Sequence, residues 1–260
     1  MLGDVPMDHP ASPSTTASAT PDLAQRVRRA LSGRSPAQIL TAATKTIAQK
    51  LRRMSPASRA AARIDAAFDR QWGTDTSREV TMSQLDFPVE LRSSSHHYQA
   101  SGAHILDETI ACAAVDPARF TFVDLGCGKG RVVLLAAARG FADVIGVEYS
   151  PILVATAEAN ARQFLARGGA VIVPRFWQGN AADYPMPGGD VFVYLYNSFG
   201  ADILTGCLAR MECAKRDDPT RRIILVYVNP QHGDLIAARP GWQEGQSGDD
   251  MRSFECMVTG

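Results

Sequence analysis

From residue 101 onward, short apolar runs alternate with helical segments, and this alternation constrains the fold more than any other feature of the sequence. Five runs suit strands buried in a parallel sheet, over residues 120–125, 143–148, 171–178, 190–196 and 222–228. Helical segments precede or separate them, over residues 103–114, 130–139, 150–167 and 201–214. Residues 242–258 predict a closing hairpin. The pattern predicts an α/β fold with a doubly wound, mostly parallel sheet of seven strands and right-handed crossovers.

The region before this core has a different composition. Residues 1–21 are rich in Pro, Ser, Thr and Ala and predict a disordered tail, whereas residues 22–100 predict a helical arm and a long loop. The clearest arm helix starts at Ser55-Pro56 and ends at Gly73. Its predicted stripe is Ala60, Ile64, Ala67/Phe68 and Gln71/Trp72. Such a stripe needs a surface to cover, so we expect the helix to pack on the main domain or on a second chain.

Charge and cysteine content bear on the binding partners, the cellular compartment and the presence of a metal site. The net charge is zero, but residues 1–70 carry eleven Lys and Arg against five Asp. This basic arm suits either nucleic acid, an acidic partner or a membrane surface, or simply a solvated helix face, which we favour; no dedicated nucleic-acid recognition domain is visible. Five cysteines without CxxC spacing predict free thiols, a reducing compartment and no metal site. Without a long apolar run or a signal h-region, we expect a cytoplasmic protein that does not insert into membranes.

The strongest motif is VDLGCGKGR (residues 123–131), between the first strand and its helix. Glycines there let the backbone turn tightly and approach a ligand, and the helix start offers free N–H groups. A dinucleotide fingerprint needs a third glycine at position 131, where the chain has Arg131. Asp124 would also repel a pyrophosphate. Both features argue against a dinucleotide.

The order D-x-G-x-G-x-G resembles motif I of class I S-adenosylmethionine (SAM)-dependent methyltransferases. In that family the loop lies against the methionine part of SAM, whose ammonium favours a nearby carboxylate. The resemblance therefore implies a SAM cofactor, held by Asp124, Gly126, Gly128 and Gly130. It extends to Glu148, eighteen residues after Gly130, which is expected to accept hydrogen bonds from the ribose hydroxyls.

A weaker match follows the third strand. There the family often has an acidic residue near the adenine amino group, and this chain has Asn180. An amide oxygen can still accept from that amine. The other reading is that Asn180 only terminates the strand.

The fourth strand ends in Tyr196-Asn-Ser-Phe199, the position that faces the transferred methyl in this family. The sequence resembles the Asn/Asp-Pro-Pro-aromatic motif of amino-group methyltransferases, with serine in place of the first proline. By this resemblance Asn197 accepts the hydrogens of an amine and directs its lone pair, while Tyr196 and Phe199 contact the substrate. The alternative is that Asn197 caps the next helix, helped by Ser198.

The resemblance is nearest to uncharacterised bacterial methyltransferases and more distant to histone lysine methyltransferases of the non-SET type. Shared features are FDRQWGTDTS (68–77), HHYQAS (96–101) and YVNP (227–230). The resemblance covers roughly residues 65–240. We expect residues 22–100 to form the arm and cofactor lid, and residues 101–260 to form the SAM-binding domain. Tyr98 is then a candidate for lining the methyl channel, and His232 a candidate substrate contact; each has an equally simple structural reading.

Three functions remain open at this point. The favoured one is methyl transfer to an amino group, on protein lysine or another amine. A small-molecule O- or C-methyltransferase would need a base, for which only His232 is placed. The third is a SAM-binding module without turnover. The intact glycine loop, Glu148 and the YNSF motif together argue against it, because a domain without turnover has no reason to keep a motif at the reactive end.

Overall fold

The structure is a computed structural model that describes residues 56–78, 80, 103–248 and 250–258. The expected tail over residues 1–21, the arm before Pro56, most of the expected lid and Tyr98 lie outside the described residues. Nothing in the described part tests the proposed boundaries of the tail and the lid.

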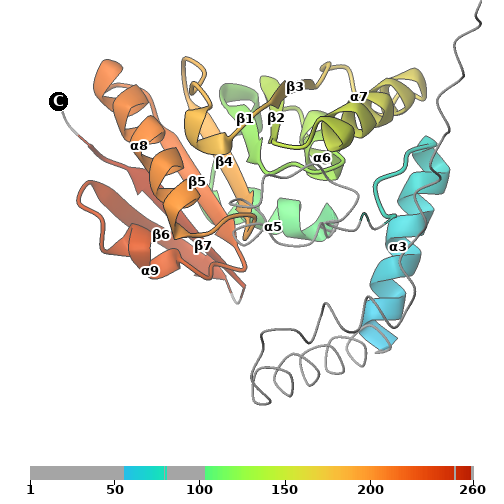
Figure 1. The fold of residues 1–260 in the computed structure, drawn as a ribbon, viewed down its shortest axis with the longest axis horizontal. Coiled ribbons are helices and arrows are strands. Elements are labelled where there is room, and N and C mark those ends of the chain that lie inside the picture. Colours follow the sequence, from blue (N-terminus) through green and yellow to red (C-terminus); the bar gives the residue numbers. More distant parts are fainter. Residues whose placement is uncertain (1–55, 79, 81–102, 249, 259–260) are drawn as a thin grey trace, which may run out of the picture. The chain divides into compact units, whose positions relative to one another are not determined.

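Seven strands form one sheet in the order β3-β2-β1-β4-β5-β7-β6 (Figure 1). The strands are β1 (Thr121–Leu125), β2 (Asp143–Glu148), β3 (Arg175–Gln178), β4 (Val191–Tyr196), β5 (Ile223–Val228), β6 (Trp242–Gly248) and β7 (Met251–Cys256). β1 to β5 pair in parallel, and β7 runs antiparallel to both of its neighbours. The predicted doubly wound, mostly parallel seven-stranded sheet is confirmed.

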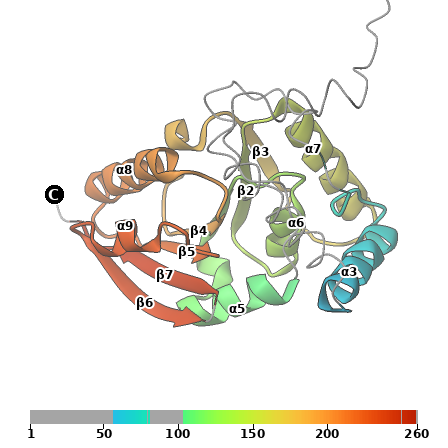
Figure 2. The ribbon, with the colours of Figure 1, turned by 60° about the horizontal axis from the view of Figure 1, so that its bottom comes forward.

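Helices cover both faces of the sheet. They are α3 (Pro56–Trp72), α5 (Ala103–Ala113), α6 (Arg131–Ala138), α7 (Pro151–Ala166), α8 (Ala201–Asp217) and α9 (Gly233–Ala237), with short 3-10 turns at Pro117–Arg119 and Ala181–Asp183. Successive strand residues enter opposite cores: Val193 and Leu195 pack with α8, whereas Phe192 and Tyr194 pack with α5 and α6. Figure 2 shows α5 and α8 on opposite sides of the strands.

Helix α3 packs on the main domain, one of the two expected outcomes. Phe68 and Trp72 both contact the ring of Phe164 in α7, with centroids 6.1 and 4.6 Å away. Gly73 ends the helix in the left-handed region (φ 68°), as predicted. The predicted stripe is wrong at Ala60 and Ile64, which are exposed (Ile64 63%), because the contact with α7 involves only the last two turns of α3. Within those turns Phe68 and Trp72 make the contact, whereas Ala67 and Gln71 are exposed.

The start of β3 and the end of α8 differ from prediction by three or more residues, and one helix was not predicted. β3 starts at Arg175 rather than at residue 171, because Pro174 cannot join the ladder; Val171 is 94% exposed. The strand does lie at the sheet edge, as expected. Helix α8 runs three residues beyond the predicted residue 214, and α9 was not predicted. Within the described part of the chain, no helix is long and apolar enough to cross a membrane.

Candidate functional site

The glycine loop lies where β1 ends and α6 begins. Gly126, Gly128 and Gly130 all have positive φ (83°, 55° and 82°), the region that glycine enters without steric cost. The N–H groups of Gly126 and Cys127 donate to the carbonyl of Val147, at 2.8 and 3.0 Å. The loop is therefore held against the end of β2.

The end of β4 meets this loop directly. A Cβ at Gly126 would lie 2.6 Å from the Cβ of Ser198 and 3.3 Å from the ring of Phe199. The absence of a side chain at Gly126 is thus what lets the segment Tyr196–Phe199 pack against the loop. The fold brings together the two strongest sequence signals, which lie about 70 residues apart in the chain.

Glu148 lies at the end of β2, as the sequence predicted, and its carboxylate is buried. One oxygen accepts from the N–H of Gly128 at 3.0 Å, and the other from the N–H of Ser150 at 2.9 Å. Burial raises the pKa of Glu148, although these hydrogen bonds act in the opposite direction. The side chain is therefore fixed beside the glycine loop.

Asp124 is buried next to Glu148, on β1. Burial, together with the neighbouring charge of Glu148, raises the pKa of Asp124 to about 8. Burial likewise raises the pKa of the Cys127 thiol in the loop. A site with two buried acidic groups is poorly matched to an anion and well matched to a ligand that carries positive charge.

The two basic residues of the loop do not offset this charge. Lys129 and Arg131 are 2% and 3% exposed, and they bind carboxylates of the segment from α3 to Arg78. The loop therefore turns its cations away from the carboxylates of Asp124 and Glu148. This donor set fits the cationic cofactor SAM and does not fit a pyrophosphate, in agreement with the sequence reading.

Asn180 begins a short 3-10 turn after β3, and its side-chain oxygen accepts from the N–H of Ala182 at 3.1 Å. The preceding Gly179 donates its N–H to the carbonyl of Glu148 at 2.9 Å. Asn180 therefore follows directly on a residue bound to the end of β2. The turn-forming role is real, and it leaves one lone pair of the amide oxygen for a ligand.

Asn197 ends β4 with positive φ (35°) and is 8% exposed. Its side-chain oxygen accepts from the hydroxyl of Tyr227 at 3.3 Å. The capping alternative is wrong: α8 starts after Gly200 without a side-chain cap, and the Ser198 hydroxyl donates to the carbonyl of Tyr196 instead. The buried amide thus has no structural role in starting α8.

Three further predicted residues, Tyr196, Phe199 and His232, lie at or after the ends of β4 and β5. Tyr196 is half-buried, and burial together with the charge of Asp250 raises its pKa. Phe199 packs on the α8 side of the core. His232 is half-buried, after β5 and directly before α9.

Sequence reasoning missed Tyr227. It reads as one more apolar residue in a buried strand, but its hydroxyl reaches Asn197. The available signal was its place near the end of β5, the strand beside β4: Tyr227 lies opposite Leu195, two residues before Asn197.

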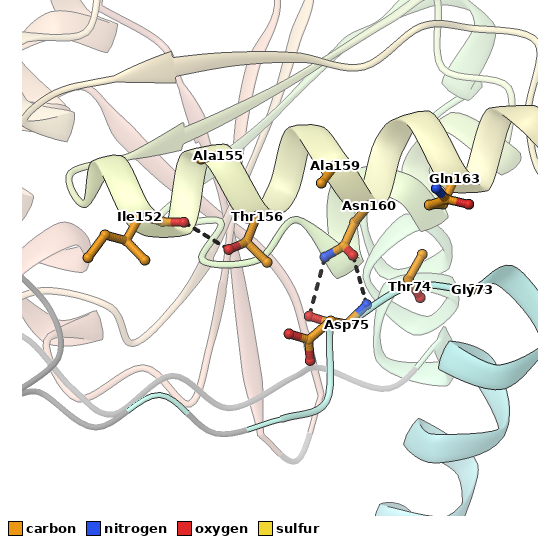
Figure 3. A pocket seen from close by; sticks show the side chains of 9 residues that line it. All are labelled: Gly73, Thr74, Asp75, Ile152, Ala155, Thr156, Ala159, Asn160 and Gln163. Atoms are coloured by element: carbon orange, nitrogen blue, oxygen red, sulfur yellow. Dashed lines mark hydrogen bonds between the residues drawn. The ribbon is translucent and has the colours of Figure 1, made fainter.

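A separate groove of about 630 Å³ lies between α7 and the turn after α3 (Figure 3). Its lining contains none of the predicted site residues; it consists of Gly73, Thr74, Asp75, Ile152, Ala155, Thr156, Ala159, Asn160 and Gln163. Among the described residues, no group of three or more His, Cys, Asp or Glu side chains is arranged to hold a metal ion.

Comparison with known proteins gives one family and a set of fold neighbours. Residues 122–211 match the family model described as a methyltransferase domain. No curated protein sequence matches the chain. Similar solved structures include the magnesium protoporphyrin IX methyltransferase from Synechocystis PCC 6803 with bound SAM, at 20% identity and TM-score 0.44, over 59% of this chain and 77% of that one.

Two further solved structures are similar to a comparable degree. An RNA methyltransferase from Salinibacter ruber, in complex with S-adenosyl-L-homocysteine, has 19% identity and TM-score 0.42 over 62% of this chain and 94% of that one. A predicted N6-adenine-specific DNA methylase from Listeria monocytogenes has 13% identity and TM-score 0.45, over 60% and 51%.

Proposed function

We propose that this chain, whose residues 122–211 match a methyltransferase domain, is a SAM-dependent methyltransferase that methylates an amino group, and that Asn197 orients this acceptor. The amine is that of a protein lysine or another primary or secondary amine. The observation that carries the proposal is the position of the buried Asn197 amide, beside Ser198, which packs on the glycine loop.

The cofactor supplies a methyl group on a positively charged sulfur when it is bound. Glu148 would hold the ribose hydroxyls, Asp124 would balance the positive charge, and Asn180 would accept from the adenine amine. The main chain of Gly126–Gly130 would form the wall of the site. These assignments use the acceptor atoms described above and require no change in the loop.

Asn197 suits an amine because its side-chain oxygen has two lone pairs and Tyr227 uses one. The other can accept an N–H of the acceptor, which holds the nitrogen lone pair in one direction and stabilises the positive charge that develops on nitrogen. The ring of Phe199 would exclude water and stabilise the same charge. No base is needed if the amine arrives neutral.

A hydroxyl or carbon acceptor is the second candidate. It would need a base, and His232 is the histidine that the described structure places after β5. No printed contact links the His232 side chain to Asn197. The amine therefore remains the better-supported acceptor.

The test is methyl transfer from radiolabelled SAM to fractionated cell lysate, followed by analysis of the labelled product. An N-methylated product is expected, and an O-methyl product would contradict the amine proposal. Asn197→Ala should then lower turnover about 10- to 1,000-fold while SAM affinity stays unchanged. Asn197→Asp should retain more activity than Asn197→Ala, because a carboxylate still accepts the hydrogens of the amine.

The matched control is Asn229→Ala. Asn229 also follows a strand and also has positive φ (50°), but it binds Gln231 rather than the residues around the glycine loop. Equal losses of turnover in Asn197→Ala and Asn229→Ala, or loss of SAM binding by Asn197→Ala, would contradict the proposal that Asn197 orients the acceptor.

A further inference from the structure

The cations of the glycine loop are bound by a segment that lies 50 to 70 residues earlier in the chain. We call residues Asp65–Arg78 the docking segment; it comprises the end of α3 and the turn that follows. Its contacts with the loop are polar and largely buried, although a surface helix needs only an apolar stripe to pack. This excess of specific contacts requires an explanation.

Arg131 is the first anchor. Its guanidinium donates to the Thr76 hydroxyl at 2.7 Å and to the Asp65 carboxylate at 2.5 Å, and it lies 3.6 Å from the Asp69 carboxylate. It also stacks over the ring of Phe68, 4.6 Å from the centroid. Four residues of the docking segment thus surround a single residue at the start of α6.

Lys129 is the second anchor. Its ammonium donates to the carbonyl of Arg78 at 2.7 Å and lies 3.2 Å from the Asp75 carboxylate. A buried ammonium without such partners would be costly, so the loop conformation that buries Lys129 depends on the docking segment.

Asn160 of α7 hydrogen-bonds to both the glycine loop and the docking segment. Its amide nitrogen donates to the carbonyl of Lys129 at 3.0 Å and to the carbonyl of Asp75 at 3.3 Å, and its oxygen accepts from the N–H of Asp75 at 2.7 Å. Figure 3 shows Asn160 projecting from α7 toward the Asp75 main chain. The carbonyl of Lys129 lies between Gly128 and Gly130, so this contact acts on the loop backbone itself.

Asp69 gives the docking segment its shape. Its carboxylate accepts from the hydroxyl of Thr74, from the N–H and hydroxyl of Thr76 and from the N–H of Ser77. Burial opposes the charge, but these hydrogen bonds lower the pKa of Asp69 to about 2. The turn is therefore prearranged to present Asp75 and Thr76 to the loop.

We propose that the docking segment is an integral part of the cofactor site: it removes the two loop cations from the side where Asp124 and Glu148 lie and fixes the main chain of Gly128–Gly130. Lys129, Arg131 and Asn160 are then positioning residues, and docking of the segment is thermodynamically coupled to SAM binding. This inference rests on SAM being the cofactor and is independent of the acceptor.

The first test is Asn160→Ala in the full chain, with SAM binding measured by calorimetry. The dissociation constant should rise at least about tenfold, because the variant loses one buried hydrogen bond to the loop backbone and two partly buried ones to the main chain of Asp75. Asn160→Asp keeps the acceptor for Asp75 and should lie between wild type and Ala. The matched control is Asp107→Asn, which breaks the exposed ion pair with Arg139 at the other end of α6 and should leave the constant unchanged.

The second test is tryptic cleavage after Arg70 and Arg78, followed by mass spectrometry with and without SAM. Coupling is reciprocal, so SAM should slow cleavage there in the wild type and slow it less in Asn160→Ala. If Asn160→Ala does not fold, Thr76→Val removes the hydroxyl that binds Arg131 and serves in its place. Folded variants that bind SAM like wild type, or cleavage that SAM does not alter, would overturn the inference; a wild type that binds no SAM would instead remove its cofactor premise.

Discussion

The hydroxyl of Tyr227 donates a hydrogen bond to the side-chain oxygen of Asn197 over 3.3 Å, and this contact links the ends of β5 and β4. Burial raises the pKa of Tyr227, so the phenol remains a donor at neutral pH. A donor on one side of the amide fixes which way its oxygen faces. Tyr227 therefore sets the orientation in which Asn197 meets an acceptor.

Tyr227→Phe is expected to lower kcat about 3- to 10-fold, because a neutral hydrogen bond that holds the amide is lost while the ring remains. SAM affinity should not change. Steady-state kinetics with the acceptor identified from lysate, together with calorimetry, would measure both quantities. Tyr184→Phe is the control, since Tyr184 is buried against Trp177 away from Asn197. In an Asn197→Ala background, the Tyr227→Phe effect should disappear, and additive effects would separate the two residues.

Glu148→Gln is expected to weaken SAM binding about 10- to 100-fold. The variant loses the charged acceptor, and its amide NH₂ is placed opposite the N–H of Gly128 or of Ser150, where no donor can be satisfied. Titration calorimetry with SAM gives the constant, and NAD should not bind to either protein. Glu158→Gln, on the exposed face of α7, is the control. An unchanged constant for Glu148→Gln would mean that other residues hold the ribose.

Asp124 should make the ligand-free protein less stable as the pH rises. Its pKa is 3.8 ordinarily and about 8 in the folded state, so between these values the native chain holds a proton that the unfolded chain has released. Stability then falls with increasing pH across this window. Asp124→Asn removes the penalty, and its Tm should exceed that of wild type at pH 8 but not at pH 4. Parallel Tm profiles for the two proteins would contradict this assignment.

Asp124 should also make SAM affinity depend on pH, in the direction opposite to the stability of the ligand-free protein. A bound cation favours ionised Asp124, so affinity should rise with pH toward about 8 and proton release should accompany binding below it. The α-amino group of the ligand also titrates near 8, and Glu148 is the neighbouring acidic group. The quantity to compare is therefore the difference between the wild-type and Asp124→Asn profiles, measured by calorimetry in buffers of different ionisation enthalpy. Asp124→Asn should bind more weakly at pH 8 despite its higher stability.

The positions of the strands along the chain could be predicted because each buried strand carries a continuous apolar run, as in Val191–Tyr196. Local turn chemistry also predicted α3, between Ser55-Pro56 and Gly73. It also predicted that the glycine loop follows β1 and that the segment around Asn197 follows β4. Periodicity predicted Ile64 to be buried because it repeats with Phe68, but a pattern cannot show how far along a helix its partner extends.

The polar network could not be predicted from the sequence. In the sequence, Lys129 and Arg131 are simply two basic residues of a glycine loop, and only the fold reveals carboxylates 54 to 66 residues earlier as their partners. Asn160 likewise reads as one polar residue on an exposed helix. Contacts between single polar side chains leave no periodic pattern, so neither end of such a pair identifies the other.

Gly126→Ala tests the junction between the glycine loop and the end of β4. The alanine would be strained at φ 83°, and its Cβ would lie 2.6 Å from the Cβ and 2.7 Å from the hydroxyl of Ser198. The φ strain alone costs about 1–2 kcal/mol. Displacement of Ser198 would also move the adjoining Asn197, so both SAM affinity and kcat should fall in the folded variant.

A second substitution separates these two causes. Ser198→Gly removes the side chain that the new methyl group meets but leaves the strain at residue 126. The double variant Gly126→Ala/Ser198→Gly should therefore recover part of kcat while SAM affinity stays low. The control is Gly140→Ala, where φ is also positive (77°) but no atom lies within 4 Å of the added carbon. It should lower Tm without changing either functional constant. If the double variant recovers no activity, the contact between Gly126 and Ser198 is not what couples the cofactor loop to Asn197, and the strained loop backbone alone accounts for the loss.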